Sequence, residues 1–283
     1  MGIKRKLKRF LKLFQREVNK PIYIPVVEGN LLKNRRIFIS GGAGGIGFAI
    51  AEVCIRNKAS VVLAGRSKKR LENAKKELIS KTGCDKDNIY VSVIDVSDIK
   101  KIKSVFEETR LKIGNIDTLI NCAGIQKGMP IGETEEDDYD DVLEINTKGT
   151  YFMSQEFSNI LIHNNVRGNI LNISSVSGVR PAVSPYMVSK WGITGLTKGL
   201  GKKLISKDIV VNGIAPGPVA TNMLNMDGSD LYYKNAPAKR FSDPMEVANL
   251  AVFLISDMGR MIVGETVYIT GGCGTLTLDD MQY

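Results

Sequence analysis

Short runs of β-branched residues alternate along this chain with longer stretches of helical periodicity, and this alternation limits the possible folds more than any other feature. The expected strands are RIFIS (36–40), SVVLA (60–64), IYVSVI (89–94), DTLIN (117–121), GNILNIS (168–174), DIVVNGI (208–214) and GETVYIT (264–270). The expected helices cover residues 46–57, 67–81, 98–113, 135–163, 186–206 and 243–256. Seven strands joined by crossover helices predict an α/β protein with one doubly wound, seven-stranded, mostly parallel sheet.

A glycine-rich turn, SGGAGGIG, follows the first expected strand and opens the first expected helix. Glycines at such a point let the backbone turn sharply and let a phosphate approach the amides of the helix N-terminus. The turn satisfies two glycine patterns, one at Gly42, Gly44 and Gly47 and one at Gly41, Gly45 and Gly47. We therefore expect a dinucleotide phosphate site in a Rossmann-type domain; the alternative is a turn with a packing role alone.

The end of the second expected strand indicates which dinucleotide is bound. An NAD site normally presents an acidic residue to the ribose 2′-hydroxyl at this place. Here the segment is LAGRSKKR, with Arg66 and no acid. Arginine can hold a 2′-phosphate, so NADP(H) is favoured and NAD(H) is the alternative. In the competing interpretation, Arg66 is a solvated charge at the start of a basic helix.

Tyr186 and Lys190 are four residues apart in an expected helix, in a chain with a single histidine. Residues at this spacing share a helix face, so the two side chains are expected to lie in one site. A nearby ammonium, together with the positive charge of an oxidised nicotinamide, favours the phenolate form of a tyrosine. A phenol could then take the part in proton transfer that imidazole usually plays. The alternative is a half-buried tyrosine beside a lysine on an amphipathic helix.

Together with four further motifs, these residues resemble the short-chain dehydrogenase/reductase family over residues 35–275. SGGAGGIG is similar to the family's glycine turn, with Ser40 in place of threonine, and Asp95–Val96 to its adenine-contacting pair. The remaining matches, in the family's order, are NCAG (121–124), NISS (172–175), YMVSK (186–190) and PGPVAT (216–221).

The resemblance implies a catalytic set. Tyr186 is expected to be the general acid or base, and Lys190 to bind the nicotinamide ribose and favour the phenolate. Ser175 is expected to orient the substrate carbonyl, and Asn146 to hold a water of the proton relay. Because Ser175 and Tyr186 are closer in sequence than is usual in the family, Ser174 is the alternative to Ser175.

The resemblance also implies the cofactor contacts and part of the assembly. The residues expected at the cofactor are Ser40, Gly41, Gly45, Ile46, Gly47, Arg66, Asp95, Val96, Asn121, Ala123, Gly124, Tyr186, Lys190, Pro216, Gly217, Val219 and Thr221. Residues 222–242, with Met223, Met226, Tyr232 and Tyr233, are expected to form a mobile lid over the substrate. A homodimer or homotetramer is expected.

Composition excludes several other classes of protein. With 43% apolar and 24% charged residues, the chain is typical of a globular protein rather than a disordered one. Its four cysteines are scattered and there is no histidine cluster, so neither a metal site nor a disulfide framework is predicted and a cytoplasmic setting is favoured. Residues 1–20 contain eight Lys or Arg and one Glu, and so carry most of the net charge of +9. The nearly neutral body gives no reason to expect nucleic-acid binding.

The basic arm suggests a separate role from the body. We divide the chain into the arm and connector at 1–34 and the oxidoreductase domain at 35–283. Six apolar residues of the arm recur at the spacing of one helix face: Ile3, Leu7, Phe10, Leu11, Phe14 and Val18. A basic amphipathic helix is therefore predicted, which could lie on the anionic inner face of a membrane through residues 1–20. Docking on the body or on another subunit, or a solvated tail, is the alternative.

The sequence thus predicts an NADP(H)-dependent oxidoreductase that interconverts a carbonyl and a secondary alcohol by hydride transfer. The C-terminal part, RFSDPMEVANLAVFLIS and VGETVYITGG, is similar to that of 3-oxoacyl-carrier-protein reductases and of sugar or polyol dehydrogenases. A 3-oxoacyl thioester is the first substrate hypothesis, and a sugar or polyol of envelope glycan metabolism is the second. The rival from another class is a non-catalytic dinucleotide-binding regulator.

Overall fold

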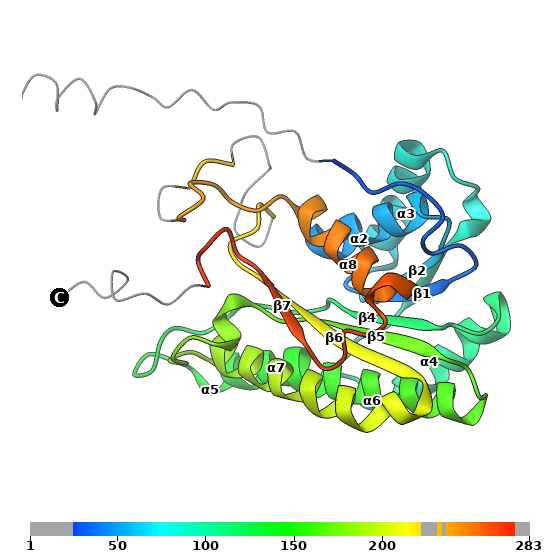
Figure 1. The fold of residues 1–283 in the computed structure, drawn as a ribbon. Helices are drawn as coiled ribbons and strands as arrows, with labels where there is room; N and C mark the ends of the chain where they lie inside the picture. The colour runs from blue at the N-terminus through cyan, green and yellow to red at the C-terminus, as the bar shows by residue number, and fades with distance from the viewer. Residues whose placement is uncertain (1–24, 222–230, 234–235, 275–283) are drawn as a thin grey trace, which may run out of the picture.

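The computed structural model describes residues 25–221, 231–233 and 236–274 (Figure 1). Its seven strands are β1 (Arg36–Ser40), β2 (Ser60–Gly65), β3 (Ile89–Val93), β4 (Thr118–Asn121), β5 (Gly168–Ile173), β6 (Ile209–Pro216) and β7 (Thr266–Ile269). They form one sheet in the order β3-β2-β1-β4-β5-β6-β7. Every neighbouring pair in this sheet is parallel. The doubly wound α/β fold predicted from the sequence is confirmed.

Helices cover both faces of this sheet, as a parallel sheet requires. They are α2 (Gly45–Arg56), α3 (Lys68–Thr82), α4 (Ile99–Ile113), α5 (Glu136–Val142), α6 (Thr150–His163), α7 (Pro185–Leu204) and α8 (Pro244–Ile255). Figure 1 shows α2, α3 and α8 on one face, and α4 to α7 on the other. Each predicted helix has its counterpart, with ends that differ by one or two residues.

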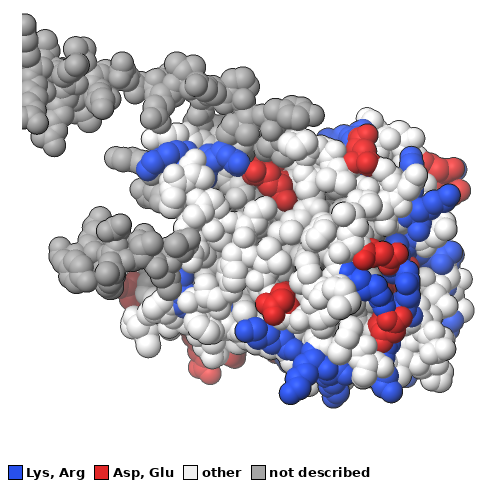
Figure 2. All heavy atoms as spheres, in the orientation of Figure 1, with Lys and Arg blue, Asp and Glu red and all other residues white. Residues whose placement is uncertain are grey.

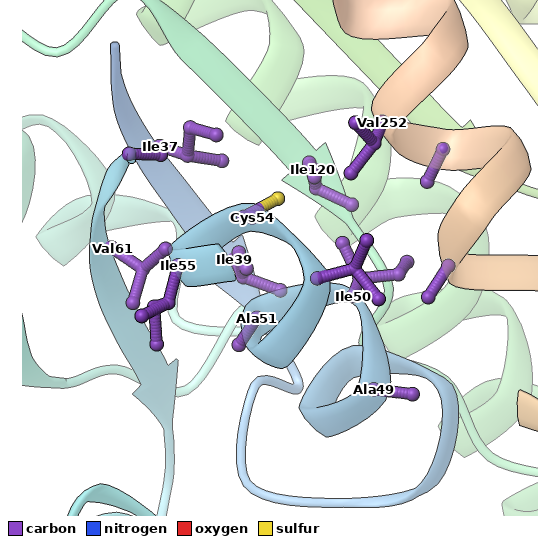
Figure 3. Packing of buried hydrophobic residues seen from close by; sticks show 14 of the residues in the cluster. Ile37, Ile39, Ala49, Ile50, Ala51, Cys54, Ile55, Val61, Ile120 and Val252 are labelled. Carbon is purple, nitrogen blue, oxygen red and sulfur yellow. The ribbon is translucent and has the colours of Figure 1, made fainter. Parts of the chain in front are cut away.

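Strand β1 shows why the two faces need different partners. Ile37 and Ile39 point into the hydrophobic cluster beneath α2 and α8 (Figure 3), whereas Phe38 belongs to the cluster beneath α4 and α6. All three side chains are fully buried. Phe38 meets Phe106 of α4 edge to face, with ring centroids 4.9 Å apart. The three central residues of the strand are therefore all apolar, unlike the alternating pattern of a sheet with one face in water.

The predicted helix 135–163 differs from the observed one in its middle turn. Residues Leu143–Gly149, labelled η2, are π-helical and join α5 to α6 without a break. A π-helical turn accommodates an extra residue and changes the direction in which a side chain points. Asn146, at the centre of this turn, is the predicted relay residue. Helical periodicity alone predicts a regular helix here, because the deviation depends on contacts that Asn146 makes elsewhere in the chain.

The connector before β1 is held against the domain by two asparagines. The Asn249 side chain of α8 accepts from the Val27 amide at 3.0 Å and donates to the Pro25 carbonyl at 2.7 Å. Asn57 donates to the Val27 carbonyl at 2.7 Å. The predicted amphipathic helix at residues 1–20 lies outside the described residues. Within residues 25–221, 231–233 and 236–274, no helix is both long and apolar enough to cross a membrane.

Candidate active site

The sheet changes its winding direction between β1 and β4, which are adjacent although two strands separate them in sequence. From β1 the chain crosses toward β2, and from β4 it crosses toward β5. Ligands of open parallel sheets bind outside the carboxyl ends of the strands at such a point. SGGAGGIG follows β1 and NCAG follows β4, so both predicted motifs lie at this edge.

The glycine turn has the geometry that a phosphate site requires. Gly41 and Gly45 have φ of +71° and +47°, a region that favours glycine. A Cβ on Gly47 would lie 2.4 Å from the Gly41 carbonyl oxygen, so only glycine permits this packing of α2 against the turn. No side chain caps the N-terminus of α2, and its first turn contains no acid. Its free amides and positive dipole end therefore suit an anionic group.

Ser40 joins the two strands that flank the switch point. Its Oγ accepts from the amides of Cys122 and Ala123, at 3.2 and 3.3 Å, and the side chain is buried. These bonds tie the end of β1 to the start of the NCAG loop. Ser40 thus fixes the NCAG loop relative to β1. Its contact with a cofactor stays a prediction.

Other predicted cofactor residues surround the glycine turn along the same edge. Thr221 contacts it closely: a Cβ on Gly45 would lie 3.2 Å from the Thr221 Cγ2. Arg66 is exposed at the end of β2. Asp95, after β3, accepts at Oδ1 from both the amide and the hydroxyl of Ser97, at 3.0 and 2.7 Å.

The remaining cofactor candidates are mostly packed into this framework. Val96 is buried, Ile46 packs on the core beneath α2, and Val219 is buried where it pairs with Ser242. Pro216 ends β6, and a Cβ on the following Gly217 would meet the Thr270 backbone at 2.9 Å. The predicted cofactor residues therefore lie at the carboxyl ends of the strands, in the loops that follow them, or in the first two turns of α2 and α7.

Tyr186 and Lys190 lie in the first two turns of α7. Ser184 caps this helix by accepting from the Met187 amide, and Pro185 occupies its first position. The Lys190 Nζ lies 5.5 Å from the centroid of the Tyr186 ring. It also donates to the Ile173 carbonyl at 2.9 Å, at the end of β5. The two side chains share one face, as their spacing predicts, and the buried ammonium is fixed by the strand.

Asn146 is joined to the same site by its carboxamide. Its Oδ1 accepts from the Ile125 amide at 2.9 Å, and its Nδ2 donates to the Ile125 carbonyl at 2.9 Å and to the Ser189 hydroxyl at 3.0 Å. Ser189 donates in turn to the Tyr186 carbonyl at 2.7 Å. A Cβ on Gly124 would lie 3.2 Å from the Asn146 Oδ1 and 3.8 Å from the Lys190 Nζ. The loop after β4, the π-helical turn and α7 therefore meet here.

The two candidate serines differ in what their hydroxyls contact. The Ser174 Oγ lies 3.1 Å from the Lys190 carbonyl and 2.9 Å from the Thr194 hydroxyl. The Ser175 Oγ accepts from the Ser177 amide at 3.1 Å, and no described group accepts its hydrogen. Ser174 thus anchors β5 to α7, while Ser175 keeps a donor. This geometry favours Ser175 as the group that would face a substrate.

A buried polar network beneath the site was not anticipated from the sequence. The Asn121 Nδ2 donates to Asn172 and to the Ser154 hydroxyl, both at 2.9 Å, and Asn172 donates to Thr197 at 3.0 Å. The side chains come from β4, β5, α6 and α7, and all are buried. Asparagines inside two apolar strands were the available signal. The network ties both strand ends to the two helices that shape the catalytic side.

Arg180 is a second feature that the sequence analysis missed. It lies in the loop between Ser175 and Tyr186, and its guanidinium donates to the carbonyl of Cys273, just past β7. The Arg180 carbonyl accepts from the Trp191 indole at 2.7 Å. No acid within the described residues pairs with Arg180, and its Nε is buried without a partner there.

The predicted lid falls partly outside the described residues, at 222–230 and 234–235, which include Met223 and Met226. In the described part, Tyr232 pairs antiparallel with Arg240, and the ring of Tyr233 stacks on Phe241 with centroids 4.5 Å apart. The Arg240 guanidinium binds both oxygens of Glu246 at 2.6 and 2.7 Å. This ion pair holds the pKa of Glu246 below its ordinary value.

Cys122 lies directly after β4, in the NCAG segment. Burial raises the pKa of the Cys122 thiol to about 12, although the Lys190 ammonium acts in the opposite direction. At neutral pH the thiol is therefore protonated and is a poor nucleophile. Among the described residues, no cluster of His, Cys, Asp or Glu could hold a metal ion.

The chain is similar in sequence to several proteins of known family. Residues 41–274 match a family profile described as enoyl-(acyl carrier protein) reductase. A 3-oxoacyl-[acyl-carrier-protein] reductase of Aquifex aeolicus is 32% identical over 246 residues, covering 85% of this chain and 98% of the relative. A gluconate 5-dehydrogenase of Gluconobacter oxydans is 32% identical over 250 residues, covering 85% of this chain and 95% of the relative.

Solved structures lead to the same conclusion. A short-chain dehydrogenase from Bacillus anthracis has a TM-score of 0.77 and 28% identity, covering 86% of this chain and 97% of that one. A gluconate 5-dehydrogenase from Burkholderia cenocepacia, solved with NADP and tartrate, has a TM-score of 0.79 and 27% identity, covering 88% of this chain and 98% of that one. Sequence motifs, fold and relatives agree, and the chain belongs to the short-chain dehydrogenase/reductase family of oxidoreductases.

Proposed function

We propose that the protein interconverts a carbonyl and a secondary alcohol with NADP(H), using Ser175, Tyr186, Lys190 and Asn146. One observation carries this proposal: the uncapped, glycine-lined N-terminus of α2 and the Tyr186–Lys190 face of α7 both lie at the carboxyl edge of the sheet. A dinucleotide bound across this edge would place its nicotinamide beside the tyrosine. A protein that only binds a dinucleotide has no need of the proton-transfer set.

The chemistry divides between the cofactor and the chain. When bound, the nicotinamide supplies or accepts the hydride. Ser175 donates a hydrogen bond to the carbonyl oxygen and orients it, and Tyr186 passes the phenolic proton to that oxygen. Lys190, held by the Ile173 carbonyl, would stabilise the phenolate that remains and would bind the ribose of the cofactor. Asn146 keeps the π-helical turn in place beside Ile125, where a relay water would be bound.

NADP(H) is favoured over NAD(H) by the residues after β2. The strand ends at Gly65, and the next residue is Arg66, with no acid before or within the first turn of α3. An acid there would bind the ribose 2′-hydroxyl and repel a 2′-phosphate, whereas arginine attracts it. The Burkholderia gluconate 5-dehydrogenase binds NADP. NAD(H) stays the alternative for this chain.

A 3-oxoacyl thioester is the substrate that we propose first. Relatives named 3-oxoacyl-[acyl-carrier-protein] reductase from Aquifex aeolicus and Thermotoga maritima are 32% and 34% identical over 246 residues. The site offers such a substrate a hydrogen bond from Ser175 to the ketone that is reduced.

A sugar acid or polyol is the second candidate, and Arg180 favours it. A guanidinium without an acidic partner among the described residues, in the loop between the serine and the tyrosine, suits a carboxylate. The proteins named gluconate 5-dehydrogenase from Gluconobacter oxydans and Burkholderia cenocepacia match 85% and 88% of this chain. A role in envelope glycan metabolism would belong to this second candidate.

The test is NADPH oxidation with a 3-oxoacyl thioester, a keto-sugar acid and its neutral keto-sugar analogue, on the wild type and Tyr186→Phe. We expect turnover of at least one substrate by the wild type, lost about 100-fold to 10,000-fold in Tyr186→Phe, with NADPH affinity unchanged. Turnover of the thioester alone supports the first candidate. Preference for the acid over its neutral analogue supports the second. Cofactor binding without turnover of any carbonyl would instead support the non-catalytic regulator.

A homodimer or homotetramer is part of this proposal. The outer face of α7 exposes Val188 and Trp191, and that of α6 exposes Tyr151 and Ile162, with each side chain 40–48% accessible. Large apolar side chains on two adjacent helices suit a contact with a second copy. Light scattering after size-exclusion chromatography tests this, and a monomer at micromolar concentration would contradict it.

The place of the protein in the cell is also a proposal. We place it in the cytoplasm, with residues 1–20 in peripheral contact with the inner face of the membrane. On the face shown in Figure 2, the middle of the described body is largely uncharged, and basic and acidic side chains lie near one another toward its right side. We therefore assign the electrostatic attraction to residues 1–20. The proposed division of the chain at 34/35 rests on the sequence, because Val27 of the connector is bonded to Asn249 and Asn57 of the domain. Sedimentation with anionic vesicles at low and high salt tests the contact, with a chain lacking residues 1–20 as control.

A further inference from the structure

Arg70 lies against the glycine turn, although it comes from a different helix. It is the third residue of α3, and its amide donates to the capping Ser67 hydroxyl at 3.4 Å, which fixes where its side chain starts. A Cβ built on Gly44 would lie only 3.3 Å from the Arg70 Nη2. The guanidinium therefore extends back from α3 to the turn that precedes α2.

Gly44 is what leaves room for this arrangement. It is the N-cap of α2 and has an extended backbone with φ of −156°, which any residue can adopt. The conformation does not require glycine, yet a side chain here would press on the Arg70 guanidinium. The absence of a Cβ at Gly44 and the position of Arg70 thus fit each other.

The charged residues that precede Arg70, from the end of β2 onward, are all basic. Arg66, Lys68 and Lys69 precede it, all four basic residues are exposed, and the first turn of α3 has no acid. None of the four forms an ion pair with another described residue. Cations in the first turn oppose the helix dipole, so α3 gains nothing in stability from them. If an anion were bound there, these cations would stabilise the start of α3 instead of opposing its dipole.

We propose that Arg70 is a second specificity-determining residue for NADP(H), binding the 2′-phosphate together with Arg66. This inference rests on the proposed use of NADP(H). A 2′-phosphate presents three acceptor oxygens, and one guanidinium binds two of them at most in a bidentate pair. Arg66 approaches from the end of β2, while Arg70 approaches from the side of the glycine turn. Between them they would enclose the phosphate on the two sides that the sheet edge leaves open.

The experiment measures binding rather than turnover. Calorimetric titration of the full-length chain with NADP⁺, NAD⁺, adenosine 2′,5′-bisphosphate and 5′-AMP gives the contribution of the 2′-phosphate directly. For Arg70→Ala we expect NADP⁺ and the bisphosphate to bind about tenfold to a hundredfold more weakly, the effect of one charge-assisted hydrogen bond. Binding of NAD⁺ and 5′-AMP should change by less than about twofold, because neither has the phosphate. Arg70→Lys should recover part of the loss.

Lys69→Ala is the matched control, since Lys69 is a cation of the same helical turn, and a Cβ on Gly44 would meet Arg70 and not Lys69. It should leave the ratio of NADP⁺ to NAD⁺ affinity nearly unchanged. If Arg70→Ala weakens both dinucleotides equally, or neither, or if Lys69→Ala has the same effect, the role of Arg70 is refuted. A wild type that does not prefer NADP⁺ would refute the proposed cofactor itself. A wild type that prefers NADP⁺, with the preference intact in Arg70→Ala, would refute the role of Arg70 alone.

Discussion

At the carboxyl edge of the sheet, the part of the site next to β1 is made largely of backbone, whereas the part next to β4 and β5 is made of side chains. We call residues 40–47 and 65–70 the cofactor half, and residues 121–125, 146, 173–175 and 184–190 the catalytic half. In the cofactor half, glycines and free helix amides define the shape. In the catalytic half, Asn146 and Lys190 are held by carbonyls and amides of other segments. The two halves should therefore respond differently to mutation.

The largest difference is expected between the two serines of the catalytic half. Ser175→Ala removes the hydroxyl that would orient the carbonyl, and kcat/KM should fall about 100-fold to 1,000-fold, as when an oxyanion-stabilising donor is lost. Ser174→Ala removes bonds to α7 instead, so it should lower the melting temperature and reduce kcat/KM less. Steady-state kinetics and thermal unfolding of both variants decide between them. An inactive Ser174→Ala beside an active Ser175→Ala would exchange the two roles.

The cofactor half should be most sensitive at Gly47. Gly47→Ala places a Cβ 2.4 Å from the Gly41 carbonyl oxygen and 3.2 Å from the Gly42 Cα, so the turn must move. We expect the free energy of unfolding to fall by about 1–3 kcal/mol and both dinucleotides to bind more weakly. Gly65→Ala is the stability control, because its Cβ would meet only Leu71 at an ordinary 3.8 Å. Chemical denaturation and cofactor titration measure both effects, and an undisturbed Gly47→Ala would contradict this account of the turn.

The same division explains how much could be predicted from the sequence. The fold and the glycine turn were predictable, because apolar runs and glycines act through local backbone geometry. The π-helical turn at Asn146 was not, since it is stabilised by Ile125, twenty-one residues away in sequence. Arg70 and Arg180 look like ordinary surface charges until the structure places one against Gly44 and the other against Cys273. Such contacts between distant segments depend on tertiary structure, and no periodicity predicts them.

A smaller effect is expected when Asn146 loses its side chain. Asn146→Ala leaves the Ile125 amide and carbonyl without their partner in a buried place, which should reduce the free energy of unfolding by about 1–3 kcal/mol. These two bonds between Asn146 and Ile125, which we call the Ile125 clamp, belong to the catalytic half. Their loss should therefore also lower kcat while leaving NADPH affinity nearly unchanged. Ser189→Ala is the matched control: it removes the bond from Asn146 and the bond to the Tyr186 carbonyl but leaves both bonds to Ile125, and it should cost about 0.5–1.5 kcal/mol. Equal losses in the two variants would show that the Ile125 clamp contributes little.

The smallest expected effect concerns the segment that links the two halves. Ser242 pairs with Val219 after β6, and the segment continues into α8, which packs beside α2. Asp243 and Glu246 form a capping box at the start of α8, and Arg240 holds the pKa of Glu246 below its ordinary value. The stabilisation by this ion pair is therefore complete above the ordinary pKa of glutamate and is lost as the pH falls through the lowered value. Both side chains are about a quarter exposed, so the effect should be under about 1 kcal/mol.

Glu246→Gln tests the charge while keeping the cap, because glutamine can also accept from the N-cap amide. Between pH 7 and pH 3, the free energy of unfolding of the wild type should fall slightly more than that of Glu246→Gln, with the two curves converging at the acidic end. High salt should reduce the difference at neutral pH. If the two curves stay parallel over this range, Glu246 contributes through its cap alone, and the connection between the halves does not depend on its charge.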